Sequence, residues 1–312
     1  RKKEREIKMA TAAKEASNVN EFALKLYTKM VKSDENFFIS PFSISIALQM
    51  CLAGAKENTA KQLTELLCLK SDPTDPKQQQ TLLRSSRDML DHINNQINNG
   101  DYFKICTANK LFSMINYEIK KDFMDKMKEY FETTMDLVDF GQSAKAAKTI
   151  NSWVEEKTND KIKDLVDPQA LNSSTRLVLV NAIYFKGNWS IKFDKANTTK
   201  EDFHLLSNEK TSVDMMKLFN KKLRLKIKPN NLSCVTCELP YVGYKISMTI
   251  ILPDASVKLS DLEAKISMKD LNEIVDYSSV STQAVNVLLP KFKIKYKAEV
   301  ISIKVFILIF LI

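Results

Sequence analysis

The residue types that most often carry catalysis or bind metals are few in this sequence and widely spaced. Five cysteines stand at irregular intervals, and an odd number of this kind does not fit a disulfide framework. The one CxxC, Cys234 and Cys237, lies in a segment that alternates like a strand, so the two thiols would face opposite sides and stay isolated. The only histidines, His92 and His204, stand in no nucleophile motif. We therefore expect neither an enzyme nor a metal centre, and no cofactor.

The composition is that of a globular protein with a basic surface. Of 312 residues, 44% are hydrophobic and 27% are charged, which excludes global disorder. Only five glycines occur, and neither GxGxxG nor GxxxxGK[ST] is present, which argues against a nucleotide-binding loop. The net charge of +9 comes mostly from lysine and permits an acidic partner. Nucleic acid is not among the expected partners, because the basic residues show no zinc spacing, RNA-binding signature or aromatic platform.

Two segments alternate cationic and apolar residues, which predicts strands with four cations on one face. The first set is Lys222, Arg224, Lys226 and Lys228, and the second is Lys291, Lys293, Lys295 and Lys297. Along a strand, cations at every second residue stand about 7 Å apart. Such a row is typical of a solvated sheet face, which is the interpretation we favour, and also of a surface that attracts a polyanion such as a sulphated polysaccharide.

Four Asn-X-Ser/Thr sequences are candidate N-glycosylation sites. They begin at Asn172, Asn188, Asn197 and Asn231. A chain this rich in asparagine contains roughly three such sequences by chance, so the motifs alone do not establish modification.

The elements that would position these residues follow from hydrophobic periodicity. Helical patterns cover residues 11–32, 42–53, 56–67, 81–97, 117–131, 144–158 and 259–275. Strand-like patterns cover residues 36–40, 103–113, 133–140, 176–185, 213–218, 222–228, 234–239, 246–252 and 285–297. Helices thus dominate the first half and strands the second, without an internal repeat. This order predicts an α+β fold with helices packed around large mixed sheets.

The helix predicted over residues 42–53 begins with a strong capping signal and is apolar on nearly all sides. Ser40 stands before Pro41, where it can cap the helix while the proline occupies the first turn. Because the helix must be buried, Ser43 within it needs a hydrogen-bond partner inside the protein.

A polar residue also interrupts the apolar strand predicted over residues 176–185. Leaving the amide of Asn181 unpaired there would cost about 1–3 kcal/mol, so on local grounds it is a satisfied core amide. The strand leads to Gly187, which we expect to supply the free φ of a turn before Trp189.

Together, several segments resemble the serpin family of protease inhibitors. The family's early motif is similar to Asn36, Ser40-Pro41-Phe42-Ser43, Ala47-Leu48, Gly54-Ala55, Thr59 and Gln62. Its middle motifs are similar to Asn151-Ser152-Trp153-Val154, Thr158 and Ile162, and then to Asn181–Gly187, Trp189 and Phe193. Its late motifs are similar to Glu238-Leu239-Pro240-Tyr241, Ser247-Met248, Leu252-Pro253 and Leu289-Pro290-Lys291-Phe292. These motifs occur in the family's order over about residues 18–300, which makes the combination specific.

The resemblance implies a serpin-like α+β fold and the family's suicide-substrate mechanism. In that mechanism a serine protease cleaves an exposed reactive loop and is held as an acyl-enzyme, while the loop inserts as a new strand into the main sheet. By the same resemblance, Trp189 lies in the breach, where insertion begins. Asn181, Ser40 and Ser43 match the shutter, a polar network under the opening sheet. The implied partner is a serine protease, and the expected state is a monomer.

The sequence departs from the family after Glu299-Val300. Residues 301–312, ISIKVFILIFLI, stand where the family continues towards its hinge and reactive loop. We therefore expect three segments: a charged, Ala-rich leader over 1–17, an incomplete serpin-like domain over 18–300 and an apolar non-family tail over 301–312. The tail is shorter than the roughly 20 residues that span a bilayer, so we interpret it as a truncated or mis-spliced end, with a membrane-associating tail as the minor alternative. Its uncharged, proline-free run is an aggregation hazard.

Two functions follow as hypotheses. The first is a serpin-type serine protease inhibitor, of which this chain lacks the reactive loop and so is not expected to inhibit by itself. The alternative is a non-inhibitory binding or carrier protein with a polyanion site of the heparin type. No signal peptide is recognisable in this sequence. The resemblance to the family nevertheless implies an extracellular protein, and a cytoplasmic protein is expected if Met9 is the natural start.

Overall fold

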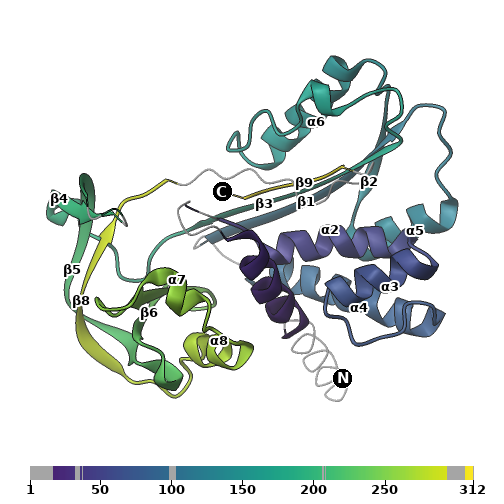
Figure 1. Cartoon of the computed structure of the whole chain (residues 1–312). Coiled ribbons are helices and arrows are strands. Elements are labelled where there is room, and N and C mark those ends of the chain that lie inside the picture. The colour runs from purple at the N-terminus through teal and green to yellow at the C-terminus, as the bar shows by residue number, and fades with distance from the viewer. Residues whose placement is uncertain are drawn as a thin grey trace.

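The chain folds into two β-sheets with helices packed around them (Figure 1). The computed structural model describes residues 17–31, 36, 38–97, 103–205, 207, 209–293 and 306–311. The α-helices in these ranges are one over residues 17–30, α2 (Pro41–Gly54), α3 (Glu57–Leu66), α4 (Pro76–Asp91), α5 (Lys121–Phe131), α6 (Ser143–Lys157), α7 (Leu259–Glu263) and α8 (Met268–Val275). The predicted α+β class is confirmed.

The main sheet has four strands and lies between two layers of helices (Figure 1). Its strands are β1 (Phe103–Met114), β2 (Thr134–Val138), β3 (Leu177–Gly187) and β9 (Phe306–Leu311), in the order β2-β1-β3-β9. β1 is antiparallel to β3 and parallel to β2, and β9 is parallel to β3. α6 covers one face of the sheet, and α2 to α5 lie on the other (Figure 1).

The two faces of β3 follow from the strand's period of two. Val178 and Val180 point to the α6 side, where they join a core with Ile150 and Val154. Leu179, between them, joins a separate core on the α2 side with Ile46, Met50 and Met127. Because both faces are buried, this strand reads as a continuous apolar run in the sequence. Asn181 shares the α2 side with Leu179, two residues away.

α2 is the central helix beneath this sheet, and its start follows the predicted capping pattern. The Ser40 hydroxyl accepts a hydrogen bond from the backbone N–H of Ser43 at 3.2 Å, and Pro41 occupies the first turn. The helix is buried on nearly all sides, as predicted. It ends at Gly54, where an added Cβ would lie 2.9 Å from the ring of Phe123 on α5.

The second sheet has five strands, and α7 and α8 pack on one of its faces (Figure 1). Its strands are β4 (Thr199–His204), β5 (Lys210–Ile227), β6 (Cys234–Pro240), β7 (Ser247–Pro253) and β8 (Thr282–Pro290). The order is β4-β5-β6-β7, and β8 pairs with β5. All of these pairs are antiparallel.

Several predicted boundaries in this half of the chain are wrong. The strands expected over 213–218 and 222–228 form the single strand β5, because a register shift after Leu218 carries the pairing with β8 across Asn220. The strand expected over 285–297 ends at Pro290, which has no N–H with which to continue the ladder. The helix expected over 259–275 is two helices, since Ser267 caps a new one with a capping box.

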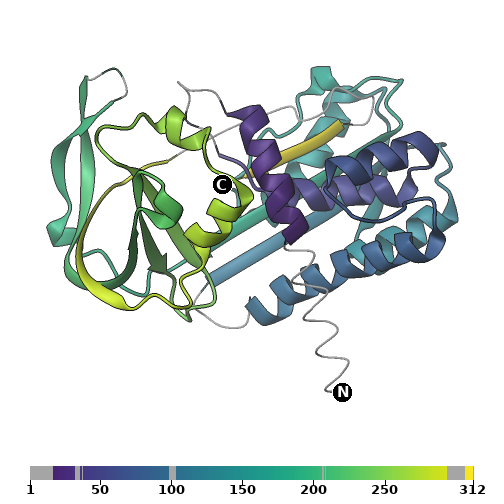
Figure 2. The same ribbon diagram turned by 60° about the horizontal axis from the view of Figure 1, so that its bottom comes forward.

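The helix over residues 17–30 lies between α2 and the α7–α8 pair (Figure 2). Phe22 anchors it in a core with Ile44 and Leu48 of α2. None of the helices that the structure describes is long and apolar enough to cross a bilayer.

One side chain of α6 forms two hydrogen bonds with the segment that follows the helix. Asn151 donates its amide to the Val166 carbonyl at 3.0 Å and accepts from the Val166 N–H at 2.8 Å. Val166 is buried, so these two bonds satisfy a backbone N–H and a backbone C=O that water does not reach. The Asn151 side chain thus supplies the donor and the acceptor that the backbone of a neighbouring strand would otherwise provide.

We predict that Asn151→Ala lowers the free energy of unfolding by about 1–3 kcal/mol, because it leaves the Val166 N–H and C=O buried without partners. Asn197→Ala removes an exposed amide of the same size and is the matched control, with an expected change within about 0.5 kcal/mol. Urea unfolding followed by far-ultraviolet circular dichroism measures both. Equal losses in the two variants would contradict the role assigned to Asn151.

Candidate functional site

A buried polar network joins β3 to β1 and to α2. Asn181 stands directly opposite Asn109 in the β1–β3 register, and its amide nitrogen donates to Asn109 Oδ1 at 2.6 Å. The hydroxyl of Ser43 on α2 donates to Asn181 Oδ1. Ser43 is 1% exposed and Asn181 3% exposed, so the bond between them is shielded from water, whereas Asn109 is only partly buried. In this low-dielectric setting an unmade bond would cost more than on the surface.

The network anchors β3 from one side only. Its two side-chain hydrogen bonds run to β1 and to α2, whereas the backbone edge of β3 beyond Asn181 faces β9, with Ile309 as the residue opposite. A change of partner at that edge therefore leaves both side-chain bonds intact. The arrangement can hold β3 in place while the strand beside it is exchanged.

Two of the predicted shutter residues are brought together, and a third acts at a distance. Ser43 contacts Asn181 directly, whereas Ser40 caps α2 and so fixes the turn that carries Ser43. Sequence reasoning missed Asn109. Its signal was a polar residue within an apolar strand, the same signal that identified Asn181, but its partner became visible only with the register of the sheet.

At the end of β3, Trp189 lies in an aromatic cluster that links the two sheets. Its ring stacks on Tyr241, with centroids 4.3 Å apart and planes 16° from parallel. Tyr241 also meets Phe185 edge-on at 5.0 Å. Burial raises the pKa of the Tyr241 hydroxyl, so the ring stays a neutral phenol. The backbone supports this contact, since Ser190 N–H donates to the Pro240 carbonyl at 2.9 Å.

The role expected for Gly187 is wrong. It is the last residue of β3, and among the described glycines only Gly243 has a positive φ. The reason for glycine is space: an added Cβ would lie 2.7 Å from Tyr241 Cδ1 and 3.0 Å from Phe185 Cζ. Glycine therefore allows the Tyr241 ring to lie against the backbone.

The first row of predicted cations is not a row of free charges. Arg224 forms an ion pair with Glu238, directly opposite on β6, at 3.0 Å. The Lys226 ammonium group lies 3.2 Å from the Glu273 carboxylate and donates to the backbone carbonyls of Glu273 and Asp276. Its side chain is only 10% exposed. Lys222 and Lys228 are exposed, and Lys228 lies beyond the end of β5.

The second row is only partly described. Lys291 and Lys293 are exposed and follow the end of β8, whereas Lys295 and Lys297 lie outside the described residues. The polyanion site stays a prediction.

The candidate glycosylation sites all lie at exposed residues. Asn172, Asn188, Asn197 and Asn231 are each exposed. The side chain of Asn172 accepts a hydrogen bond from the Ser174 N–H at 2.9 Å, which forms a tight turn at the surface. Exposure is compatible with modification and does not test it.

The described cysteines stand apart from one another. Cys234 packs in the core beneath α7 and α8, and Cys237 packs on the opposite face of β6, as the strand pattern predicted. Burial raises the pKa of the Cys51 thiol to about 12, which makes it unreactive. Within the described ranges, no group of three or more His, Cys, Asp or Glu residues is arranged to hold a metal ion.

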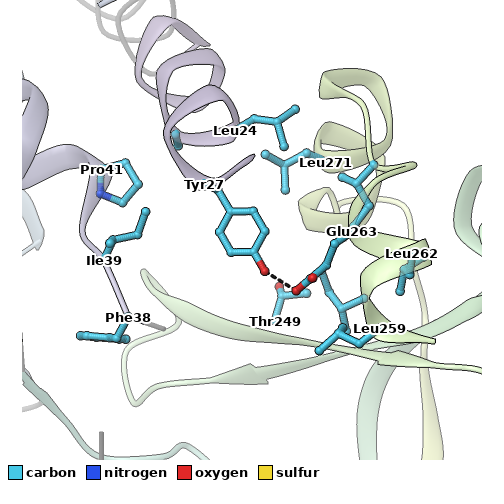
Figure 3. Close-up of a pocket in the computed structure, with 13 residues that line it drawn as sticks. Leu24, Tyr27, Phe38, Ile39, Pro41, Thr249, Leu259, Leu262, Glu263 and Leu271 are labelled. Atoms are coloured by element: carbon cyan, nitrogen blue, oxygen red, sulfur yellow. Dashed lines mark hydrogen bonds between the residues drawn. The ribbon is translucent and has the colours of Figure 1, made fainter. Parts of the chain in front are cut away.

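A second candidate site is a cavity of about 510 Å³ between the helix over residues 17–30, α7, α8 and β7 (Figure 3). Its walls are mainly apolar, with Leu24, Phe38, Leu259 and Leu271 among them. The one hydrogen bond drawn there runs from the Tyr27 hydroxyl to the Glu263 carboxylate, and burial together with that carboxylate raises the pKa of Tyr27. The sequence did not signal this site, because its walls come from separate segments.

We predict that Ser43→Ala lowers the free energy of unfolding by about 1–3 kcal/mol, since it removes a donor from the buried oxygen of Asn181. Ser45→Ala is the matched control: Ser45 lies on the same helix, is equally buried, and bonds only to the Phe42 carbonyl of its own helix. We expect a loss below about 1 kcal/mol there.

A double-mutant cycle separates the pair from its surroundings. Ser43→Ala and Asn181→Ala should show a coupling of about 0.5–3 kcal/mol in urea unfolding, whereas Ser45→Ala with Asn181→Ala should be additive. A coupling of zero for the first pair would show that the network does not stabilise β3.

Comparison with known proteins connects this arrangement to one family. The profile of the family described as Serpin (serine protease inhibitor) matches residues 17–303. A leukocyte elastase inhibitor of Xenopus tropicalis is 36% identical over 289 residues, which are 90% of this chain and 73% of that protein. An uncharacterized serpin-like protein of Methanosarcina mazei is 36% identical over 292 residues, which are 91% of this chain and 64% of that protein.

A solved structure shows the same fold. Ovalbumin from the emu, Dromaius novaehollandiae, superposes with a TM-score of 0.85 at 28% identity, over 93% of this chain and 76% of that one. This chain thus spans about two thirds to three quarters of the length of the proteins it resembles. A family profile that matches most of its length, together with these relatives, shows that the chain belongs to the serpin family.

Proposed function

We propose that this chain is the larger part of a serine protease inhibitor that acts by inserting a strand into its main sheet. The observation that carries the proposal is the one-sided anchoring of β3 by Ser43, Asn109 and Asn181. A sheet that accepts a new strand must keep β3 in place while its other edge changes partner. The network meets that requirement, because none of its bonds lies at the β9 edge of the backbone.

The energetics of strand addition support the same conclusion. β3 is paired with β1 over its whole length but with β9 only from Val178 to Ile183. Each further backbone hydrogen bond contributes about 0.5–1.5 kcal/mol net, so a strand that pairs along all of β3 gains several kcal/mol. In the family mechanism, a gain of this kind holds the cleaved protease as an acyl-enzyme.

The reactive loop is expected beyond the residues that match the family. We propose that the activity needs such a loop, and the leukocyte elastase inhibitor of Xenopus tropicalis, of which this chain covers 73%, is the proposed source of it. The bond that is cleaved would lie in that loop, so the loop and not the described residues would select the target protease.

We predict that residues 1–300, joined to the remaining C-terminal segment of the Xenopus tropicalis relative, form a complex with leukocyte elastase that survives SDS and migrates at the summed mass. The 312-residue chain alone should form no such complex with elastase, trypsin or chymotrypsin. Gel electrophoresis after incubation at several molar ratios measures both. If a chimaera that unfolds cooperatively is cleaved but never trapped, the inhibitor proposal fails and a non-inhibitory function is favoured.

The second candidate function is a non-inhibitory binding protein, and the cavity at Tyr27 and Glu263 favours it. Its volume falls in the range of about 300–1,000 Å³ typical of pockets for small molecules. The polyanion part of this hypothesis has less support, because the ion pairs of Arg224 and Lys226 remove two charges from the predicted row.

We predict that the 312-residue chain elutes from heparin resin at the same salt concentration as from a sulfopropyl cation exchanger. Lys222→Ala combined with Lys228→Ala should lower both values equally, as should the control pair Lys29→Ala and Lys61→Ala, which removes two exposed lysines elsewhere. A polyanion site would be established instead if the unaltered chain eluted from heparin at a higher salt concentration than from the cation exchanger. That difference should then disappear in the Lys222 and Lys228 variant and persist in the control pair.

A further inference from the structure

The last described strand, β9, occupies the open edge of β3. Residues Phe306–Leu311 pair in parallel with Val178–Ile183 without a register shift, and β9 also lies against α2. The family profile matches only as far as residue 303. The edge of β3 is therefore filled by a strand that the family comparison does not account for.

The composition of β9 suits pairing rather than exposure. Its sequence, FILIFL, contains no charge and no proline. Edge strands in soluble proteins usually carry lysine, proline or a bulge, which prevent other chains from pairing with them. β9 has none of these protections, and pairing with β3 supplies hydrogen-bond partners to the backbone groups along one of its two edges.

We infer that residues 306–311 are an internal strand ligand of β3, which keeps this edge closed to other extended chains until it is displaced. A tethered segment competes at an effective concentration of about 1 mM, so for a strand that binds this edge with a Kd of about 10 μM the apparent affinity of a free strand falls about 100-fold. The inference rests on the proposed function only for its consequence, namely that strand insertion must first displace β9. The occupancy itself rests on the pairing.

The direct test is binding of a free strand with and without the internal one. The probe is a fluorescein-labelled peptide of residues 305–311 with three added lysines for solubility, and a peptide of scrambled order is the control. A variant that ends at Ile303 should bind the probe about 100-fold more tightly than the 312-residue chain, as measured by fluorescence anisotropy. Equal affinity for both proteins would overturn the inference.

A pair of proline variants distinguishes backbone pairing from hydrophobicity. Leu308→Pro and Ile309→Pro remove similar apolar groups, but the N–H groups of successive strand residues point to opposite sides. One variant loses a bond to β3 and should bind the probe at least about tenfold more tightly than the other. Equal behaviour of the two would contradict pairing through the β9 backbone.

Hydrogen exchange on the unaltered 312-residue chain gives an answer even if the shortened variant does not fold. The amides of residues 306–311 should exchange at least about tenfold more slowly than in the free peptide. Free exchange would overturn the inference, as would protection that appears only in oligomers seen by light scattering, since β9 would then pair between copies. None of these measurements contains a protease, so their outcome is independent of the elastase experiment.

Discussion

The hydrogen bond between Ser43 and Asn181 is the interaction on which the arrangement of the main sheet depends. Most of the contact between this sheet and its helices is apolar, and apolar packing has no strong directional preference. The amide of Asn181 does have one, because its oxygen and nitrogen need separate partners at fixed geometry. Ser43 and Asn109 provide them from two different elements. β3, the neighbouring strand β1 and the central helix α2 are thereby held in one relative position.

Much of this site could be predicted from local rules. The period of two placed Asn181 on a buried face, and the need to pair its amide followed from the cost of desolvation. The cap at Ser40 and the proline after it predicted where α2 begins, and so which face carries Ser43. The order of the motifs along the chain then brought these segments together. Asn109 escaped because pairing between β1 and β3 joins residues 72 positions apart, and no local pattern encodes that register.

The errors share a physical cause, which is that contacts between distant segments overrode local expectation. Glycine at position 187 was attributed to backbone freedom, but the ring of Tyr241 requires it. The lysine and arginine alternation in β5 predicted a solvated face, yet Glu238 and Glu273 approach from β6 and α8. The gap between two predicted strands was closed by β8, which pairs with both halves of β5. In each case the deciding residue belongs to another element.

The separation of Ser43 from Asn181 in the chain has a consequence for synthesis. The two residues are 138 positions apart. At about 5–20 residues per second, roughly 7–28 s pass between their emergence from a ribosome. During that interval α2, which is apolar on nearly all sides, has neither β3 nor the completed sheet to cover it. A helix of this kind exposes apolar surface during that interval, so the nascent chain is open to aggregation until residue 181 emerges.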